Sequence, residues 1–275
     1  WEIFSNLSDC PDTVADEVLY WQQMTEEQSR VYELAYDRIL ELEQQQKQSL
    51  QEQKEYEDYI EAWAHEIKIP LSLMTLVLEN RREDMSAPVY EKMNYTNRRM
   101  QDYVTQMLYY ARLKAVHKDY VMEMVSLEAI CEDVVEEYTE YVDAQSIEWR
   151  VQVGKEQVLT DRKGLHFMLE QILNNACKYK DAGKETSYIE MTTVVEENRI
   201  WLQIKDNGLG AEEAEIPFLP DKGFTGKTVM GQAKATGMGL YLVAQMAKDL
   251  SLCVDIESKV GESFIIRIGF PVISR

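Results

Sequence analysis

The sequence contains no long apolar run, few cysteines, only three histidines and far fewer cations than anions. No stretch of about 18 or more apolar residues is present, so the sequence predicts no transmembrane helix. Its 29 lysines and arginines face 49 acidic residues, and the formal net charge of -20 argues against direct nucleic-acid binding as the main activity. We therefore expect the chain as given to be soluble, and any nucleotide site in it to carry its own basic groups.

Cysteine pairs of the kind that hold metals or form disulfide frameworks are also missing. The four cysteines are widely scattered and include no C-x-x-C pair, so we expect buried thiols in a reducing cytoplasm. They are Cys10, Cys131, Cys177 and Cys253. The chain opens with Trp1 and Glu2 rather than Met, as expected for a piece of a longer, membrane-anchored protein.

Glycine is absent between residues 12 and 82, where only Pro70 interrupts a run that favours a long helix. Apolar residues recur there at three- and four-residue steps, and a second such stripe follows a break at residues 83–88. The first stripe is Ile60, Trp63, Ala64, Ile67, Leu71, Met74 and Leu78, and the second is Tyr90, Met93, Met100, Tyr103, Val104, Met107, Leu108 and Ala111. Two such helices form an antiparallel hairpin that encloses little volume, so we expect it to dimerise into a four-helix bundle.

Beyond about residue 117 the pattern changes to alternating strand and helix signals, and glycines become frequent. The predicted strands are 148–153, 188–195, 200–205, 252–257 and 263–270, and the predicted helices are 128–141, 163–179 and 238–250. The sequence therefore predicts a helical hairpin followed by an α/β domain.

His65 is the first candidate catalytic residue, because it lies about 200° around the helix from Ile67 and should face solvent or a docking partner. Neutral imidazole is a nucleophile, and Glu66 can accept the proton from its other ring nitrogen. Pro70 should bend the helix within one turn of His65.

A zinc motif at His65 is excluded since Ile69 stands where the second histidine would be. An ordinary surface histidine is the alternative interpretation, and His117 and His166 are expected to be structural or surface residues.

Three motifs of the second domain suit a bound nucleotide. An amide at Asn175 can help to coordinate hydrated Mg²⁺, and Lys178 can meet phosphate charge. Asp206 follows a strand and can accept a hydrogen bond from an adenine amino group, while the glycines after it allow close backbone approach. The stretch 235–240 opens a helix whose N-terminus can bind phosphate. Each motif alone also fits an ordinary turn, helix start or satisfied amide.

A mobile lid is expected between Gly210 and Gly237, where prolines and glycines are frequent. Its lysines would supply positive charge to phosphates, although solvated loop lysines are the alternative. They are Lys222, Lys227 and Lys234.

Four segments, in this order, resemble the boxes of the histidine kinase family. Residues 65–70 resemble its H-box, 171–179 its N-box, 206–210 its first glycine box and 237–240 its second. The resemblance implies an α + α/β protein, in which a helical-hairpin dimerisation and phosphoacceptor domain precedes a Bergerat-type α/β sandwich that binds ATP and Mg²⁺. The implied domains are a connector from a membrane anchor at 1–54, the hairpin at 55–116 and the ATP-binding domain at 117–275.

The family's site residues carry over to this sequence as expectations. His65 and Glu66 would be catalytic, Asp206 the adenine anchor and Asn175 the Mg²⁺-linked residue. The implied nucleotide-binding set is Asn175, Lys178, Tyr179, Asp206, Gly208, Gly210, Lys222, Thr225, Gly226, Gly237, Met238, Gly239 and Leu240. The implied partners are a second copy of the chain and a response regulator, with no nucleic acid.

Residues 63–68 and 222–226 look like the intramembrane-sensing kinases that work beside peptide-exporting ABC transporters. This resemblance implies a place at the cytoplasmic face of the bacterial plasma membrane, through an anchor before Trp1, with such a transporter as a further partner.

The sequence departs from the family pattern at three positions. Gln171 stands where related ATPases place a glutamate base, which favours phosphoryl transfer to protein over hydrolysis. Ile69 cannot orient a water for removing phosphate from the regulator. Pro220 occupies the place of a family phenylalanine, with Phe218 and Phe224 nearby.

The sequence thus predicts a sensor histidine kinase of a two-component system, in which His65 attacks the γ-phosphate of ATP and then passes the phosphoryl group to an aspartate of a response regulator. The alternatives are a catalytically silent adaptor that binds a regulator, and a Bergerat-type ATPase whose hairpin serves only for dimerisation.

Overall fold

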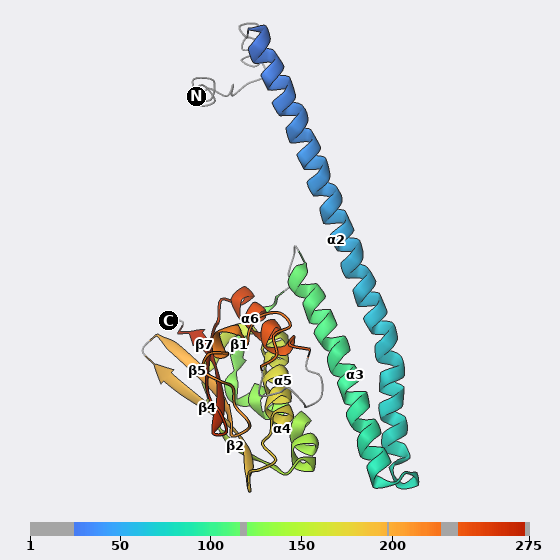
Figure 1. Ribbon diagram of the computed structural model, residues 1–275, viewed down its shortest axis with the longest axis vertical. Coiled ribbons are helices and arrows are strands. Elements are labelled where there is room, and N and C mark those ends of the chain that lie inside the picture. Colours follow the sequence, from blue (N-terminus) through green and yellow to red (C-terminus); the bar gives the residue numbers. More distant parts are fainter. Residues whose placement is uncertain (1–24, 116–119, 197, 227–235, 273–275) are drawn as a thin grey trace. The chain divides into compact units, whose positions relative to one another are not determined.

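The computed structural model describes residues 25–115, 120–196, 198–226 and 236–272, and it divides the chain into two compact units, Trp1–Tyr59 and Ile60–Arg275. Figure 1 shows how the helices and strands follow one another along the chain. The helices are α2 (Glu26–Asn80), η1 (Arg82–Asp84), α3 (Ala87–Lys114), α4 (Leu127–Ala144), α5 (Arg162–Lys178), η2 (Ile216–Phe218) and α6 (Gly239–Asp249). The strands are β1 (Met122–Ser126), β2 (Ile147–Gln152), β3 (Gln157–Asp161), β4 (Ser187–Glu196), β5 (Arg199–Asp206), β6 (Cys253–Lys259) and β7 (Ser263–Pro271).

Helix α2 extends over 55 residues, as the absence of glycine predicts. It begins after Thr25, whose hydroxyl accepts a hydrogen bond of 3.3 Å from the backbone N–H of Gln28, while the Gln28 side chain accepts one of 3.0 Å from the backbone N–H of Thr25. This reciprocal capping box satisfies two N–H groups that the helix start would otherwise leave open. None of the described helices combines the length and the apolar composition needed to cross a membrane.

The end of α2 and helix α3 lie side by side as the predicted hairpin (Figure 1). Ala64 and Leu71 of α2 pack with Val104 of α3 in a small core of their own. Part of the predicted stripes lies outside this core, since Trp63 is 37% exposed and Met93 is 41% exposed. The single hairpin therefore buries only a narrow strip of each helix.

A buried polar contact that the apolar pattern did not predict also joins the two helices. Asn97 is 1% exposed, and its amide nitrogen donates a hydrogen bond of 2.8 Å to the hydroxyl of Thr75. Gln101 donates a second one of 3.0 Å to the same oxygen. Pro88 was expected in the break between the helices, but it lies in the first turn of α3, where its missing N–H costs nothing.

The second part of the unit Ile60–Arg275 is a layer of three helices on a five-stranded mixed sheet. The strand order is β2-β4-β5-β7-β6, with β2 parallel to β4 and the other neighbours antiparallel. Helices α4, α5 and α6 cover one face of this sheet (Figure 1). All predicted strands and helices of the α/β domain are found within a few residues of their expected limits. The two-stranded antiparallel sheet of β1 and β3 was not predicted.

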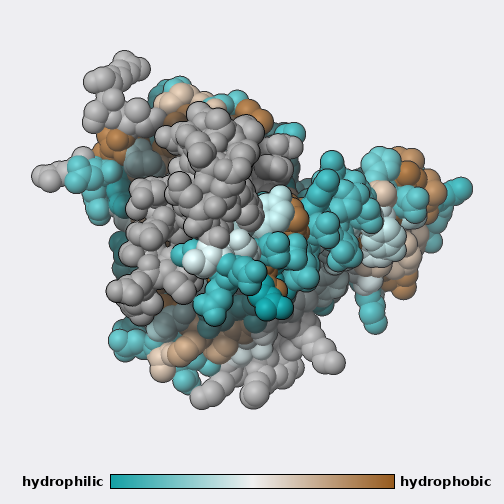
Figure 2. Space-filling view, turned by 90° about the horizontal axis from the view of Figure 1, so that it is seen from above, coloured by the Kyte–Doolittle hydropathy of each residue, from teal (hydrophilic) through white to brown (hydrophobic). Residues whose placement is uncertain are grey.

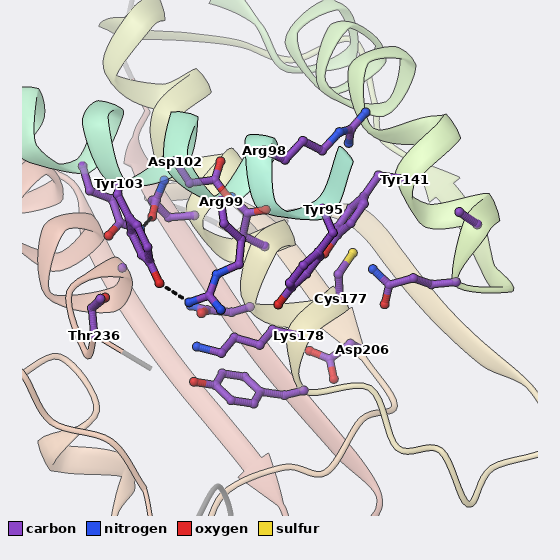
Figure 3. A pocket seen from close by; sticks show the side chains of 18 of the residues that line it. Tyr95, Arg98, Arg99, Asp102, Tyr103, Tyr141, Cys177, Lys178, Asp206 and Thr236 are labelled. Atoms are coloured by element: carbon purple, nitrogen blue, oxygen red, sulfur yellow. Dashed lines mark hydrogen bonds between the residues drawn. The ribbon is translucent and has the colours of Figure 1, made fainter. Parts of the chain in front are cut away.

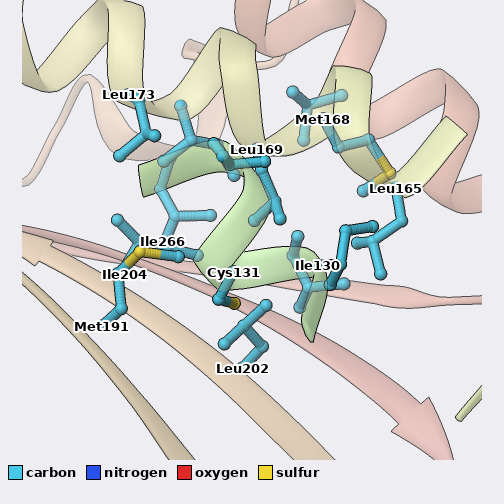
Figure 4. Close-up of a cluster of buried hydrophobic side chains, with 14 of the residues drawn as sticks. Ile130, Cys131, Leu165, Met168, Leu169, Leu173, Met191, Leu202, Ile204 and Ile266 are labelled. Atoms are coloured by element: carbon cyan, nitrogen blue, oxygen red, sulfur yellow. The ribbon is translucent and has the colours of Figure 1, made fainter. Parts of the chain in front are cut away.

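The core lies between the helices and the sheet (Figure 4). Leu165, Met168, Leu169 and Leu173 point down from α5, and each is fully buried. Alternate residues of the strands meet them from below, because successive strand side chains point to opposite faces. The labelled strand residues are Met191, Leu202, Ile204 and Ile266. Burial of each such side chain contributes about 1.5–3 kcal/mol, which makes this the rigid support for the loops at the sheet edge.

The cysteines agree with the sequence expectation in part. Cys131 and Cys177 are buried, whereas Cys253 is partly exposed, so the expectation of burial was wrong for Cys253. Cys10 lies outside the described residues. On the face shown in Figure 2, hydrophilic residues predominate among the coloured atoms and hydrophobic ones form separate patches, which fits the strongly negative composition.

Candidate functional site

His65 lies on the outer face of α2, as its position around the helix predicts. His65 and Glu66 are both exposed, while the preceding Ala64 is fully buried in the hairpin core. Ile69 is 60% exposed, one turn further along. Helix α2 continues through Pro70 to Asn80, so Pro70 does not end the helix, and the bend expected from it stays a prediction.

One cavity of about 970 Å³ brings together most of the sequence-predicted nucleotide residues (Figure 3). It is lined from α3, the end of α4, α5, the loop after β5 and the start of α6. The predicted residues that line it are Asn175, Lys178, Tyr179, Asp206, Gly210, Thr225, Gly226, Gly237, Gly239 and Leu240. His65, Glu66, Gly208, Lys222 and Met238 do not line it, and Met238 packs against the hydrophobic core instead.

Asp206 ends β5 with its carboxyl group turned into this cavity. Its side chain is 9% exposed, and burial raises its pKa to about 7, against the opposing effects of a hydrogen bond from Gly208 and the charge of Lys184. The backbone N–H of Gly208 donates that bond over 2.8 Å to one carboxylate oxygen. A carboxyl group held in this way can accept a hydrogen bond from a ligand amino group.

Gly208 acts on the site through packing. A Cβ atom at Gly208 would lie 2.4 Å from the carbonyl oxygen of Tyr179 and 2.8 Å from the Asp206 carboxylate. The next residue, Leu209, donates a backbone hydrogen bond of 2.9 Å to that same Tyr179 carbonyl. Only glycine lets the loop after β5 lie this close to the end of α5, which fixes the direction of Asp206.

Helix α5 carries the polar groups of the cavity floor. It is capped by Asp161, whose carboxylate accepts a hydrogen bond of 2.6 Å from the N–H of Gly164. Side-chain atoms of Gln171 and Asn175 come within 3.4 to 3.8 Å of the Cβ position at Gly239, where α6 begins. The N-terminus of an α-helix attracts anions, so Asn175 lies beside a suitable place for phosphate.

Lys178 supplies the positive charge on α5. It is half-buried, and its pKa is lowered by burial and then by the neighbouring charge of Arg99. Its ammonium nitrogen lies 5.3 Å from the centre of the Tyr179 ring.

Gly237 fixes the loop that leads into α6. Its φ is +63°, and a Cβ atom there would lie 2.4 Å from the carbonyl carbon of Gly223. The N–H of Gly223 donates a hydrogen bond of 3.0 Å to the Gly237 carbonyl. The hydrogen bond thereby joins a residue inside the predicted lid to the glycine at the lid's end, which lines the cavity.

Of the three lysines of the predicted lid, only Lys222 lies among the described residues. Lys222 donates a hydrogen bond of 2.7 Å to the hydroxyl of Tyr110 on α3 and lies 4.6 Å from the centre of its ring. Lys227 and Lys234 lie outside the described residues. In the structure Lys222 thus contacts the hairpin, and its expected contact with phosphate stays a prediction.

Residues of α3 form one wall of the cavity, and sequence reasoning missed them. Tyr95, Arg99, Asp102 and Tyr103 all line it. Burial raises the pKa of Asp102 to about 6, against the charge of Arg98 and the other groups that lower it. Arg99 lies about 200° around α3 from Asn97 and so points away from α2, but the apolar pattern did not mark Asn97 as buried, so the sequence alone carried no clear signal for this wall.

Among the described residues, one group of three possible metal ligands occurs, formed by Glu137, His166 and Glu170 of α4 and α5. None of the three lines the cavity. His166 lies 3.3 Å from the Glu137 carboxylate, an ion pair when protonated, which fits the structural or surface role expected for it. A metal ion in the cavity would depend on Asn175 and on ligands carried in by the nucleotide.

The chain is similar to known proteins over most of its length. The family described as "Histidine kinase-, DNA gyrase B-, and HSP90-like ATPase" matches residues 160–272. The sensor histidine kinase YxdK of Bacillus subtilis (strain 168) is 31% identical over 240 residues, which cover 86% of this chain and 72% of that protein. The sensor protein BceS of the same organism is 30% identical over 215 residues, which cover 78% of this chain and 62% of BceS.

A solved structure shows the same fold. The histidine kinase AdeS of Acinetobacter baumannii aligns with a TM-score of 0.52 at 17% identity, covering 76% of this chain and 98% of that one. At this identity the likeness concerns the fold alone. The match to YxdK covers more than two thirds of both proteins, so the resemblance found in the sequence is confirmed: the chain belongs to the bacterial sensor histidine kinases.

Proposed function

We propose that this chain is the kinase core of a two-component system, which uses ATP to phosphorylate its own His65 and then transfers the phosphoryl group to an aspartate of a response regulator. The observation that carries the proposal is the grouping of Asn175, Lys178, Asp206 and the start of α6 around one cavity, in a chain that also exposes His65 on a helix. Family membership supports the same activity.

In the proposed complex the adenine amino group donates to Asp206, and the phosphates lie near Lys178 and the N-terminus of α6. Asn175 would hold Mg²⁺ on the protein side through its amide oxygen, and the ion would supply positive charge to the phosphates. The described residues fit this arrangement because Asn175 lines the cavity and its amide oxygen lies 3.8 Å from the Cβ position of Gly239, at the start of α6.

The proposed transfer needs His65 as a neutral imidazole. The lone pair of one ring nitrogen attacks the γ-phosphorus, and the bond from that phosphorus to the β-γ bridging oxygen breaks, releasing ADP. The proton on the other ring nitrogen passes to Glu66, the adjacent exposed carboxylate. Both side chains are accessible to a docking domain, as this chemistry requires. We expect the chain to remove phosphate from the regulator only weakly, since the apolar side chain of Ile69 cannot orient the attacking water.

The proposed active form is a homodimer in which two hairpins make a four-helix bundle. Exposed apolar side chains near the hairpin core support it, because they would be covered by a second copy. They are Trp63, Leu73, Leu76 and Val77, each at least 37% exposed. The proposed domains are a connector at 1–54, the hairpin at 55–116 and the ATP-binding domain at 117–275.

The setting of the protein in the cell is also a proposal. We place it at the cytoplasmic face of the plasma membrane, with a peptide-exporting ABC transporter as a further partner. The subgroup resemblance of residues 63–68 and 222–226 supports this setting, together with the match to BceS and YxdK.

The test is incubation with γ-labelled ATP and Mg²⁺, scoring protein-bound label that is labile in acid and stable in alkali. Wild type and His166→Gln should be labelled and His65→Gln should not. His166→Gln is the matched control, since it removes a histidine of the same chain that does not line the cavity. Equal label on His65→Gln would refute the assignment, and release of free phosphate without labelled protein would favour the ATPase alternative.

A further inference from the structure

Two cations face the same cavity from different helices. Arg99 reaches in from α3 and Lys178 from α5, and Figure 3 shows the two side chains next to one another, with Asp206 further along the same cavity. The charge of Arg99 is one of the two causes that lower the pKa of Lys178, after burial. Two neighbouring cations repel one another, and an anion bound between them would relieve that repulsion.

Two tyrosines fix the direction of Arg99. Its guanidinium carbon lies 5.8 Å from the centre of the Tyr95 ring and 5.2 Å from that of Tyr103, and it donates a hydrogen bond to the Tyr103 hydroxyl. A guanidinium carries five N–H donors in a rigid plane, so phosphate oxygens can bind it alongside these contacts. The arginine is therefore held in place before any ligand arrives.

The position of Arg99 along the cavity determines which part of a bound ligand Arg99 can contact. Asp206 is suited to an amino group, whereas Lys178 and the start of α6 at Gly239 are suited to phosphate. Arg99 lies next to Lys178 but belongs to α3, which forms the wall of the cavity opposite α5. A nucleotide that uses Asp206 and Lys178 would thus carry its phosphates past Arg99.

We propose that Arg99, a residue of the hairpin, completes the phosphate site of the nucleotide cavity by binding phosphate oxygens together with Lys178. This inference rests on the proposed nucleotide-binding function and extends it to a second domain. One ligand then contacts both the hairpin and the ATP-binding domain, so its phosphates favour the arrangement in which α3 covers the cavity. Arg99 is a binding and positioning residue in this scheme and takes no part in the chemical step.

The test compares ATP, ADP and adenosine binding to the whole chain by calorimetry. Arg99→Gln should weaken ATP and ADP by about tenfold or more, the scale of one charge-assisted contact, and leave adenosine within about twofold of wild type. Arg99→Lys should restore part of the loss, because it returns the charge without the planar fork. Lys92→Gln is the matched control, since Lys92 is exposed on the same helix and does not line the cavity.

A second variant distinguishes a loss of phosphate binding from a loss of folding. Tyr103→Phe keeps the ring and removes the hydroxyl that orients Arg99, so it should weaken ATP by a smaller factor with an unchanged unfolding temperature. Equal ATP affinity of Arg99→Gln and wild type would overturn the inference, as would an equal loss for adenosine. These results differ from failure of the proposed function, in which the wild-type chain itself would bind no ATP.

Discussion

The ammonium group of Lys222 donates a hydrogen bond of 2.7 Å to the hydroxyl group of Tyr110, joining the segment after β5 to helix α3. If Lys222 also serves phosphate, as the sequence predicts, the two contacts compete for one side chain. Tyr110→Phe should then free the lysine and tighten ATP binding by about two- to threefold, the scale of an exposed polar contact.

A double variant checks this competition by the same binding measurement. In Tyr110→Phe/Lys222→Gln the gain should disappear, because the lysine responsible for it is gone. Weaker ATP binding in Tyr110→Phe alone would show instead that the contact with α3 helps to build the site.

Asp206 should couple the stability of the nucleotide-free protein to pH. Its pKa is about 7 in the folded chain, against an ordinary value of 3.8, so the folded state holds more protons than the unfolded state between these values. The stability that it contributes is fully present below about pH 3.8 and is lost as the pH rises to about 7, by at most about 4 kcal/mol.

The variant Asp206→Asn removes this loss. Its amide oxygen can still accept from Gly208, so at pH 8 its unfolding temperature should exceed that of wild type, and at pH 4 the difference should vanish. ATP binding should be lost, because the variant no longer presents a carboxylate to adenine. Asp221→Asn, at an exposed carboxyl group, is the control, and the same pH dependence in both variants would contradict the explanation.

Much of the fold could be predicted because the elements have clear periodicity. The strands β4, β5 and β7 alternate around a buried face, and α5 and α6 carry unbroken apolar stripes. The strands β1 and β3 escaped prediction since each has only five residues, three of the five in β1 are exposed, and two of the three buried residues in β3 are the polar Thr160 and Asp161.

The site was predictable where a motif lies on one segment and less so where it depends on packing between distant segments. Asn175, Asp206 and Gly239 lie in short motifs and meet in the cavity. Arg99 enters the cavity only because α3 packs beside α5 and α6, and no local pattern reports that contact. Asn97 was missed for a related reason, because a pattern of apolar residues does not mark a polar member of a core.

Gly237 should tolerate no side chain, because of both its positive φ and its close contact with Gly223. Gly261 has the positive φ without such a contact, so the two effects can be measured separately. Gly237→Ala would suffer both from its φ of +63° and from the contact of 2.4 Å with Gly223. Gly261 has a similar φ of +69°, but nothing lies within 4 Å of its Cβ position. Gly261→Ala should therefore cost about 1–2 kcal/mol of unfolding free energy from strain alone.

The two alanine variants should differ in ATP binding. Gly237→Ala should weaken it by about tenfold or more, because the cavity mouth must open to relieve the clash, whereas Gly261→Ala should bind ATP as wild type does. Calorimetry and thermal unfolding measure both effects. Equal losses of binding would mean that backbone strain, and not the contact with Gly223, controls the mouth.

Thr75 should be the most sensitive polar residue of the hairpin, because its hydroxyl accepts from both Asn97 and Gln101 and donates to the carbonyl of Leu71 over 3.1 Å. The amide oxygen of Asn97 meets no donor within the described part of the chain. Thr75→Val keeps the shape and leaves the buried amide of Asn97 without its acceptor, which should cost about 1–3 kcal/mol of unfolding free energy. Thr75→Ser keeps the hydroxyl and should lose less, through its missing methyl group. Urea unfolding followed by circular dichroism measures both variants at one protein concentration, and a Thr75→Val variant as stable as Thr75→Ser would show that packing, and not this hydrogen-bond centre, holds α2 against α3.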